Sequence, residues 1–412
     1  VSPAAGTVLA EIPVGDRPWS IARRPGQPRI YVVNKGSASI SVINASTFAI
    51  DHTVSLPRGS EPHGLVFSND GATYYLVLEA TASLQKRTAS TDALVASLAL
   101  SGRPRHLSIS NDDAKLLVSN FITPPLVGES TTTVSIASGG GQVFVVAPAT
   151  MTLASTVTLP FDTRAPSEVQ GPGLPNYLGP AVVSFGGSAA YVPTKKDNVR
   201  GGALRGLPGM TFDSTVRANT SRILLATNSE DATFRVDHDN ASLATGAALT
   251  GDDRYLLVTL ETSRELAVYD LQSGFQLMRL PTGRAPQSVA LSTSGSTAYV
   301  HNFMDRSISR FDLTQMLQTH LPATNLLAPI SVVAVEPLPA NLLQGKQLFY
   351  DAQDDRLALD NYLSCATCHN EGDGDGRVWD LGAFGEGVRN TIDLRGKGTG
   401  HGRPHWTGNF DE

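Results

Sequence analysis

A repeat of about 42 residues runs through most of this chain and limits the folds that it can adopt. In each copy an apolar strand is followed by a polar turn and by further strands of alternating apolar and polar residues. Pro18, Pro62 and Pro104, which begin the first three copies, are 44 and 42 residues apart, and Ala244 and Pro286 are again 42 apart. Such a period is typical of a β-propeller, whose four-stranded blades bury one another's faces. The sequence therefore predicts a mainly β fold.

The number of blades depends on how the ends of the repeat region pair. Six three-strand units can be counted, with one extra strand before them at 7–12 and another after them at 330–335. These two strands would form a further blade if they paired with each other. We therefore expect a six- or seven-bladed β-propeller, with seven favoured, over residues 1–336.

Long insertions interrupt the third and fourth copies of the repeat. They cover residues 121–142, 163–179 and 195–210 and are rich in Thr, Ser, Gly and Pro. Long loops on a rigid scaffold often contact ligands or partners, although loops of this length are also tolerated without any function.

A second signal comes from the only two cysteines of the chain, which lie in the pentapeptide Cys365-Ala-Thr-Cys-His369. This spacing is typical of a c-type haem attachment site. Cys365 and Cys368, one helical turn apart, would form thioethers with one porphyrin, and His369 would be the proximal iron ligand. The alternatives are a redox dithiol, which lacks its usual strand-helix context here, and half of a zinc site, which lacks a second pair of ligands.

Composition and charge exclude several classes of protein. The net charge of −6 argues against a nucleic-acid partner. The sequence has no run of about 18 apolar residues, so we expect no transmembrane segment. Haem c is assembled outside the cytoplasmic membrane, which favours a periplasmic or extracellular location. An export signal would then have been removed or would lie outside this sequence.

The repeats resemble the YVTN-type propeller repeats. The closest matches to the tetrapeptide that names them are YVVN at 31–34 and YVHN at 299–302. The resemblance covers about residues 7 to 335 and implies a propeller, commonly of seven blades.

The pattern changes after a linker at 336–339, where helical periodicity predicts a helix beginning near Ala340. GKQLF at 345–349, the haem motif, and short motifs at 388–391, 394–396 and 404–409 together resemble the haem domains of the dihaem cytochrome c peroxidase family. This implies a small α-helical cytochrome c-like domain over residues 337–412. Members of that family carry two haem domains, whereas this chain has one attachment motif. The sequence also stops at Asp411-Glu412, close to the end of the last of these motifs, so we expect the haem domain to be incomplete at its C-terminus. Whether a second haem domain is missing after residue 412 is left open by the sequence.

The second axial ligand of the iron would come from the same region. The five methionines all precede residue 337, so the local candidates are His405 and His401, of which His405 is favoured. Trp406 and Trp379 lie near the motif in sequence and could shield the haem edge, or they could simply pack in the core.

Acidic residues near the haem motif suggest two further roles. Glu386 and Arg389 are candidate catalytic residues for peroxide cleavage, and the alternative is an ordinary ion pair.

Oxygen-bearing side chains that cluster around glycines are candidate Ca²⁺ ligands. Their spacing matches no EF-hand loop. These side chains are Asn370, Asp373, Asp375 and Asp380.

In the propeller, residues beside the blade-starting prolines should face the central channel. They form a basic, histidine-containing set suited to an anionic ligand or an acidic docking patch: Arg17, Trp19, His63, Arg103, Arg105, His106, Arg284 and Gln287. His63, His106 and His301 could bind a metal if they met, and solvated channel residues are the alternative.

Together these features predict a periplasmic haem c oxidoreductase or electron-transfer protein whose propeller is a docking or substrate platform. We expect its partner to be a redox protein or a membrane-associated complex. The alternative is a non-enzymatic electron carrier or an interaction subunit of a larger assembly.

Overall fold

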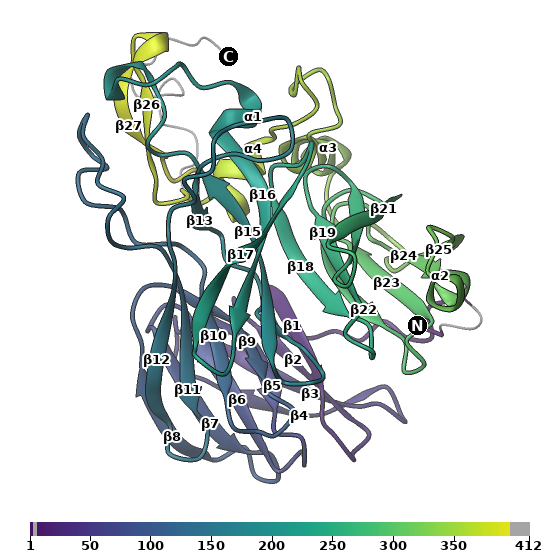
Figure 1. Ribbon diagram of the computed structural model, residues 1–412. Coiled ribbons are helices and arrows are strands. Elements are labelled where there is room, and N and C mark those ends of the chain that lie inside the picture. The colour runs from purple at the N-terminus through teal and green to yellow at the C-terminus, as the bar shows by residue number, and fades with distance from the viewer. Residues whose placement is uncertain (3–5, 396–412) are drawn as a thin grey trace.

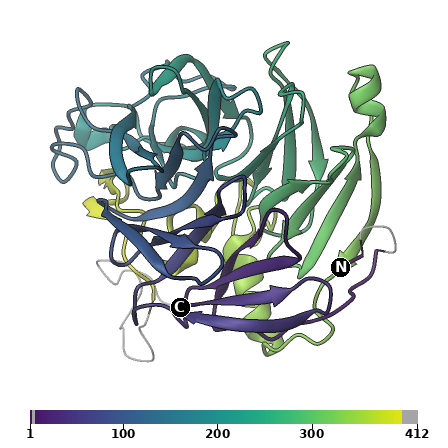
Figure 2. The ribbon, with the colours of Figure 1, turned by 90° about the horizontal axis from the view of Figure 1, so that it is seen from below.

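The computed structural model describes residues 1–2 and 6–395, and six antiparallel sheets dominate this part of the chain. The sheets are arranged around a common centre, as the ring in Figure 2 shows. Each sheet is one blade of a propeller. In five blades the strands follow one another in sequence from the centre outward, and in the fourth blade the first two short strands both pair with the third.

The six blades have the following strands. The first three blades are β1 (Pro18–Arg23), β2 (Arg29–Asn34), β3 (Ser39–Asn44) and β4 (Ala49–Ser55); β5 (Pro62–Phe67), β6 (Thr73–Leu78), β7 (Ser83–Thr88) and β8 (Leu94–Ala99); and β9 (Pro104–Ile109), β10 (Leu116–Asn120), β11 (Gly141–Ala147) and β12 (Thr152–Leu159). The last three are β13 (Leu174–Asn176), β14 (Val182–Val183), β15 (Ala189–Asp197), β16 (Val216–Leu224) and β17 (Ser229–His238); β18 (Ala244–Leu249), β19 (Tyr255–Leu260), β20 (Glu265–Asp270) and β21 (Phe275–Pro281); and β22 (Pro286–Leu291), β23 (Thr297–Asn302), β24 (Ser307–Asp312) and β25 (Asn325–Ser331).

Apolar side chains hold consecutive blades together. Five clusters of buried residues join blade one to two, two to three, three to four, four to five and five to six. Among the described residues no such cluster joins blade six to blade one. Burial of apolar surface therefore stabilises five of the six junctions.

Glycines allow the innermost strands to approach closely at the channel. A Cβ atom on Gly64 of β5 would lie 2.5 Å from the carbonyl oxygen of Arg105 in β9. One on Gly246 of β18 would lie 2.6 Å from the carbonyl oxygen of Gln287 in β22. Larger residues at these positions would push neighbouring blades apart.

The expected seventh blade is not formed by the described residues, and the favoured count is corrected to six. The leading segment 7–12 forms no strand, only an isolated bridge between Ser2 and Thr7. The trailing segment overlaps β25, which pairs with β24 as the outermost strand of blade six. Helix α2 (Thr314–Thr319) between these two strands obscures the fourth strand in the sequence pattern.

A further correction concerns blade four. The insertion expected at 195–210 begins inside β15, because Lys195 and Lys196 pair with Ala218 and Arg217 of β16. Their side chains are fully buried, which is unusual for lysine and requires buried partners. The remainder of this insertion contains η1 (Ala203–Arg205) and α1 (Phe212–Thr215).

The chain after the propeller forms a compact segment, residues 340–395, which we call the C-terminal segment. Its elements are α3 (Ala340–Tyr350), α4 (Cys365–Cys368), η2 (Asn370–Gly372), β26 (Val378–Leu381), η3 (Gly382–Phe384) and β27 (Gly387–Asn390). Helix α3 begins at Ala340, which confirms the expected start of a helix there. Figure 1 shows the segment, in yellow-green and yellow, at one end of the propeller.

Polar contacts attach the C-terminal segment to the rim of the channel. Lys35 of blade one and Arg105 of blade three bind Glu371. Ser242, before blade five, lies 3.0 Å from the hydroxyl oxygen of Thr367. The segment therefore lies across one mouth of the channel. None of the helices in the described part of the chain is both long and apolar enough to span a membrane.

Candidate functional site

Helix α4 carries the two cysteines, and its single turn places them as the haem motif requires. Cys365 and Cys368 are its first and last residues, and the backbone N–H of His369 donates to the carbonyl oxygen of Cys365 at 2.9 Å. At the start of the helix the backbone N–H of Ser364 donates to the Thr367 hydroxyl at 3.1 Å. Both thiols are free, and Cys365 is exposed.

His369 directly follows α4 and has the properties of an iron ligand. Burial lowers the pKa of its imidazole, so the ring is neutral at pH 7 and a nitrogen lone pair is available. Its Nδ1 atom is buried and has no hydrogen-bond partner among the described residues. A buried polar atom without a partner is costly unless a ligand or a water satisfies it. The donor set of two thiols and a neutral imidazole thus fits a covalently bound haem.

The thiols themselves do not resemble those of a reactive dithiol. Partial desolvation raises the pKa of Cys365 even though the residue is exposed, and burial raises the pKa of Cys368 to about 12 despite the nearby Lys195. Both groups are therefore protonated at neutral pH, whereas redox dithiols and zinc ligands need an accessible thiolate.

The hairpin β26–β27 holds three of the residues that the sequence singled out. Trp379 is buried, and its indole Nε1 donates to the Thr391 hydroxyl at 3.1 Å. The Glu386 carboxylate lies 3.9 Å from the Arg389 guanidinium, so the structure pairs these two with each other. Their roles toward a haem stay predictions. His401, His405 and Trp406, the other predicted site residues, lie outside the described residues.

Three of the four candidate calcium ligands have other partners. Asp375 pairs with Lys195 at 2.9 Å, Asp373 pairs with Arg103 and Arg395, and Asp380 accepts from the backbone N–H of Gly382. Within residues 1–2 and 6–395 no group of three or more His, Cys, Asp or Glu side chains is arranged to hold a metal ion. Calcium therefore stays a prediction from sequence.

The basic residues at the channel mouth are neutralised by acidic residues. Arg105 binds Glu79 at 2.8 Å and Glu371 at 2.6 Å, and Lys35 binds the same two carboxylates at 2.8 and 3.2 Å. Although burial acts to raise it, these cations lower the pKa of Glu79 to about 2. The expected acidic docking patch is thus supplied by the protein's own Glu371, and the cations are not free for an anionic ligand.

The same pairing extends around the mouth. Arg103 binds Glu79 and Asp373, and Arg284 binds Asp305 at 3.0 Å and Asp351 at 3.3 Å. Asp351 and Asp373 both belong to the C-terminal segment. Carboxylates of this segment therefore bind three of the four arginines in the basic set that the sequence predicted.

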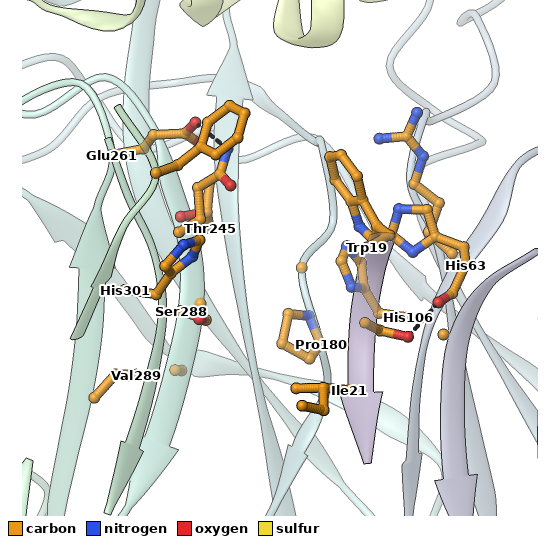
Figure 3. Close-up of a pocket in the computed structure, with 18 of the residues that line it drawn as sticks. Trp19, Ile21, His63, His106, Pro180, Thr245, Glu261, Ser288, Val289 and His301 are labelled. Carbon is orange, nitrogen blue, oxygen red and sulfur yellow. Dashed lines mark hydrogen bonds between the residues drawn. The ribbon is translucent and has the colours of Figure 1, made fainter. Parts of the chain in front are cut away.

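Below the mouth lies a cavity of about 710 Å³ along the channel axis. Figure 3 shows Trp19, His63 and His106 on one wall and Thr245, Glu261 and His301 on the other. The rings of His63 and His106 are 5.1 Å apart at their centroids. His301 lies across the cavity from them, so the three histidines do not converge on one metal.

The polar residues that line the cavity include three histidines, two arginines that are paired with carboxylates, and the unusual carboxyl group of Glu261. Burial, together with the nearby Arg105, lowers the pKa of His63 well below its usual value and that of His106 to about 3. Burial raises the pKa of Glu261 to about 7, and Glu371 adds to this effect. Glu261 accepts one hydrogen bond, from the Gln287 amide at 2.9 Å.

We expect the buried Glu261 to make stability depend on pH. Its pKa is raised from 4.5 to about 7, so the folded state favours the protonated form. The stability that protonated Glu261 contributes is fully present below 4.5, its pKa in the unfolded chain. This contribution is lost as the pH rises to and through 7, its pKa in the folded protein. Between pH 4.5 and 8 the free energy of unfolding of the wild type should therefore fall by about 3 kcal/mol relative to that of Glu261→Gln. Denaturant titrations across this range measure the difference.

Glu265→Gln is the matched control for this measurement, because Glu265 pairs with Arg279 outside the cavity. The free energy of unfolding of Glu265→Gln should change with pH as that of the wild type does. If the free energies of unfolding of the wild type and Glu261→Gln changed equally with pH, the raised pKa of Glu261 would be contradicted.

Two residues that the sequence did not single out hold α4 in place. The Tyr177 hydroxyl donates to the Cys368 carbonyl at 2.9 Å, and its ring stacks on Phe121. Lys195 lies 4.4 Å above the Tyr177 ring and binds Asp375, seven residues after Cys368. Because these contacts join positions far apart in sequence, no local pattern could have indicated them.

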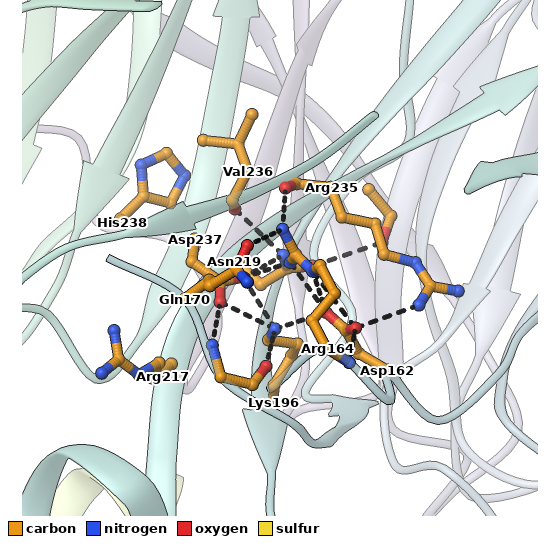
Figure 4. A network of polar contacts seen from close by, with 12 residues as sticks. Asp162, Arg164, Gln170, Lys196, Arg217, Asn219, Arg235, Val236, Asp237 and His238 are labelled. Atoms are coloured by element: carbon orange, nitrogen blue, oxygen red, sulfur yellow. Dashed lines mark hydrogen bonds and ion pairs between the residues drawn. The ribbon is translucent and has the colours of Figure 1, made fainter. Parts of the chain in front are cut away.

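A buried ionic network fixes the loop that carries Tyr177 (Figure 4). Lys196 binds Asp162 at 2.6 Å and Asp237 at 2.8 Å, and its Nζ also donates to the carbonyl oxygen of Gly171. Arg164 binds the same two carboxylates. Both cations and both anions have partners, so the network orders the insertion at 163–179 against blade four and has no open position for a ligand.

Six antiparallel sheets around one channel define this protein as a β-propeller. No protein-family model matches the chain, and no curated protein matches it. Among solved structures, it is similar to Kuenenia stuttgartiensis hydrazine synthase, with 17% identity, a TM-score of 0.53, and coverage of 75% of this chain and 81% of the other. It is also similar to the Myceliophteria thermophila Cps50 (Swd1) β-propeller domain, with 9% identity, a TM-score of 0.52, and coverage of 79% and 88%. At these identities the likeness establishes the fold alone.

Proposed function

We propose that this protein is a periplasmic haem c oxidoreductase or electron-transfer protein with a propeller of the YVTN type. The proposal rests on one observation: a one-turn helix that is followed by a neutral, half-buried histidine, whose buried Nδ1 has no hydrogen-bond partner among the described residues. Similarity to the dihaem cytochrome c peroxidase family, based on the motifs in the C-terminal segment, belongs to the same proposal.

In this proposal Cys365 and Cys368 hold the porphyrin covalently, and His369 is the proximal ligand. The haem, when bound, supplies one-electron redox chemistry at its iron. Two side chains of the propeller would hold His369 in position. The Tyr177 hydroxyl donates to the carbonyl oxygen of Cys368 at the end of α4, and Lys195 binds Asp375, which follows His369 in the chain. Burial of His369 keeps its imidazole neutral.

The propeller would act as the platform on which a redox partner protein or a membrane-associated complex docks.

An optical spectrum of the matured protein tests the proposal. We expect the absorption bands of haem c, which shift when the iron is reduced. A ferric spectrum that changes on adding peroxide supports the oxidoreductase. A spectrum that responds to reductant but not to peroxide supports the alternative, a non-enzymatic electron carrier or interaction subunit. A colourless protein from a host that assembles haem c would contradict both.

A further inference from the structure

The channel cavity has the size and lining of a small-molecule site. Its volume of about 710 Å³ lies within the range of about 300 to 1,000 Å³ that is typical of such sites. Most of its lining is apolar, with Trp19, Phe121 and Phe303 among the aromatic residues. Ile21, which is 69% exposed, lines the same cavity, so the cavity is open to solvent.

Two buried polar side chains in this cavity have atoms without hydrogen-bond partners. Glu261 and His63 are each 1% exposed, and they lie on opposite walls. Oε2 of Glu261 and both ring nitrogens of His63 have no partner among the described residues. Such atoms are costly to bury, which indicates that a bound molecule completes their hydrogen bonds.

The charges around the cavity decide what kind of molecule fits. Its two arginines are already paired, Arg105 with Glu79 and Glu371, and Arg306 with Glu336. The groups that face Glu261 are the Gln287 amide, the Tyr350 hydroxyl and the Glu371 carboxylate, none of which is a cation. Among the described residues Glu261 therefore has no counter-charge. An anion would find no free cation here, whereas a cation would supply what Glu261 lacks.

We propose that the channel cavity binds a small organic ammonium ion, with Glu261 as its counter-ion and the apolar walls around its hydrocarbon part. The neutral imidazole of His63 can accept a further N–H hydrogen bond, and the Trp19 ring, 4.9 Å from that of His63, adds an aromatic surface. This site does not depend on the haem, because none of these groups belongs to the attachment motif.

Three probes of similar shape and different charge test the inference: benzylammonium, benzyl alcohol and benzoate. Calorimetric titration into the full-length protein at pH 8, where Glu261 is ionised, should show benzylammonium binding at least about tenfold more tightly than benzyl alcohol. Benzoate should bind more weakly than either. At pH 6, one unit below the pKa of Glu261, benzylammonium should bind about tenfold more weakly, while its own charge is unchanged.

Glu261→Gln should abolish the preference for benzylammonium, and Glu265→Gln, outside the cavity, should retain it. The comparison of pH 6 with pH 8 in the wild type gives the same information if Glu261→Gln does not fold. Equal affinity for the alcohol and the ammonium ion, tighter binding of benzoate, or no binding of benzylammonium would overturn the inference. Because calorimetry does not read out the iron, these outcomes are independent of whether haem is attached.

Discussion

The double variant Cys365→Ala/Cys368→Ala should contain no covalent haem when it is produced in a host that assembles haem c. The two thiols are the only cysteines of the chain, so no other residue can form a thioether. We expect the intact mass of the wild type to exceed that of the polypeptide by one haem. The double variant should have the mass of the polypeptide alone and no haem c absorption.

Ser364→Ala is the control for this experiment, since Ser364 precedes Cys365 but has no thiol. It keeps the backbone N–H that donates to the Thr367 hydroxyl and should still carry covalent haem. The propeller should fold in all three proteins, because the five apolar clusters that join the blades lie outside α4. Covalent haem on the double variant, or its absence from the matured wild type, would contradict the proposed function.

Lys195→Met should destabilise the protein by about 3 to 5 kcal/mol. The Lys195 ammonium is fully buried between Asp197 at 3.0 Å and Asp375 at 2.9 Å, and both carboxylates are also fully buried. Methionine preserves much of the side-chain volume but leaves two buried carboxylates without a cation. Urea titration followed by circular dichroism measures the loss in the free energy of unfolding.

Two further variants separate the loss of the ion pair from a general effect of replacing lysine. Lys86→Met, at a half-buried position where Nζ donates to the Pro148 carbonyl, should cost no more than about 1 kcal/mol. Asp375→Asn added to Lys195→Met should restore part of the loss, because one uncompensated charge is removed. A Lys195→Met variant as stable as the Lys86→Met control would show that the buried pair contributes little.

Much of the propeller could be predicted from the repeat. Strands β1, β5, β9 and β22 begin at the prolines that mark the repeat, and β18 begins at Ala244. Alternation of apolar and polar residues locates strands because successive side chains of a strand point to opposite faces. The blade count was less accurate, since α2 and a short loop separate β24 from its outer partner β25.

The candidate site was only partly predictable. Cys365, Cys368 and His369 form a local motif, and local spacing is visible in a sequence. The channel residues were predicted to be basic and suited to an anionic ligand. In the structure Arg105 is instead bound by Glu371, which lies 266 residues later in the chain. Glu261 was not singled out, because a glutamate in an apolar strand carries no sign of the cavity that it faces.

The sequence by itself determined the repeating strands and the single cysteine motif, because both depend on spacing between near neighbours. Only the tertiary structure decided that six blades form in the described chain and that the C-terminal segment lies across the channel. It also decided the charge of the channel, where carboxylates from distant segments neutralise the arginines and leave one buried glutamate without a partner cation. Electrostatic interactions depend on distance in space and on burial, and a sequence specifies neither until the chain has folded.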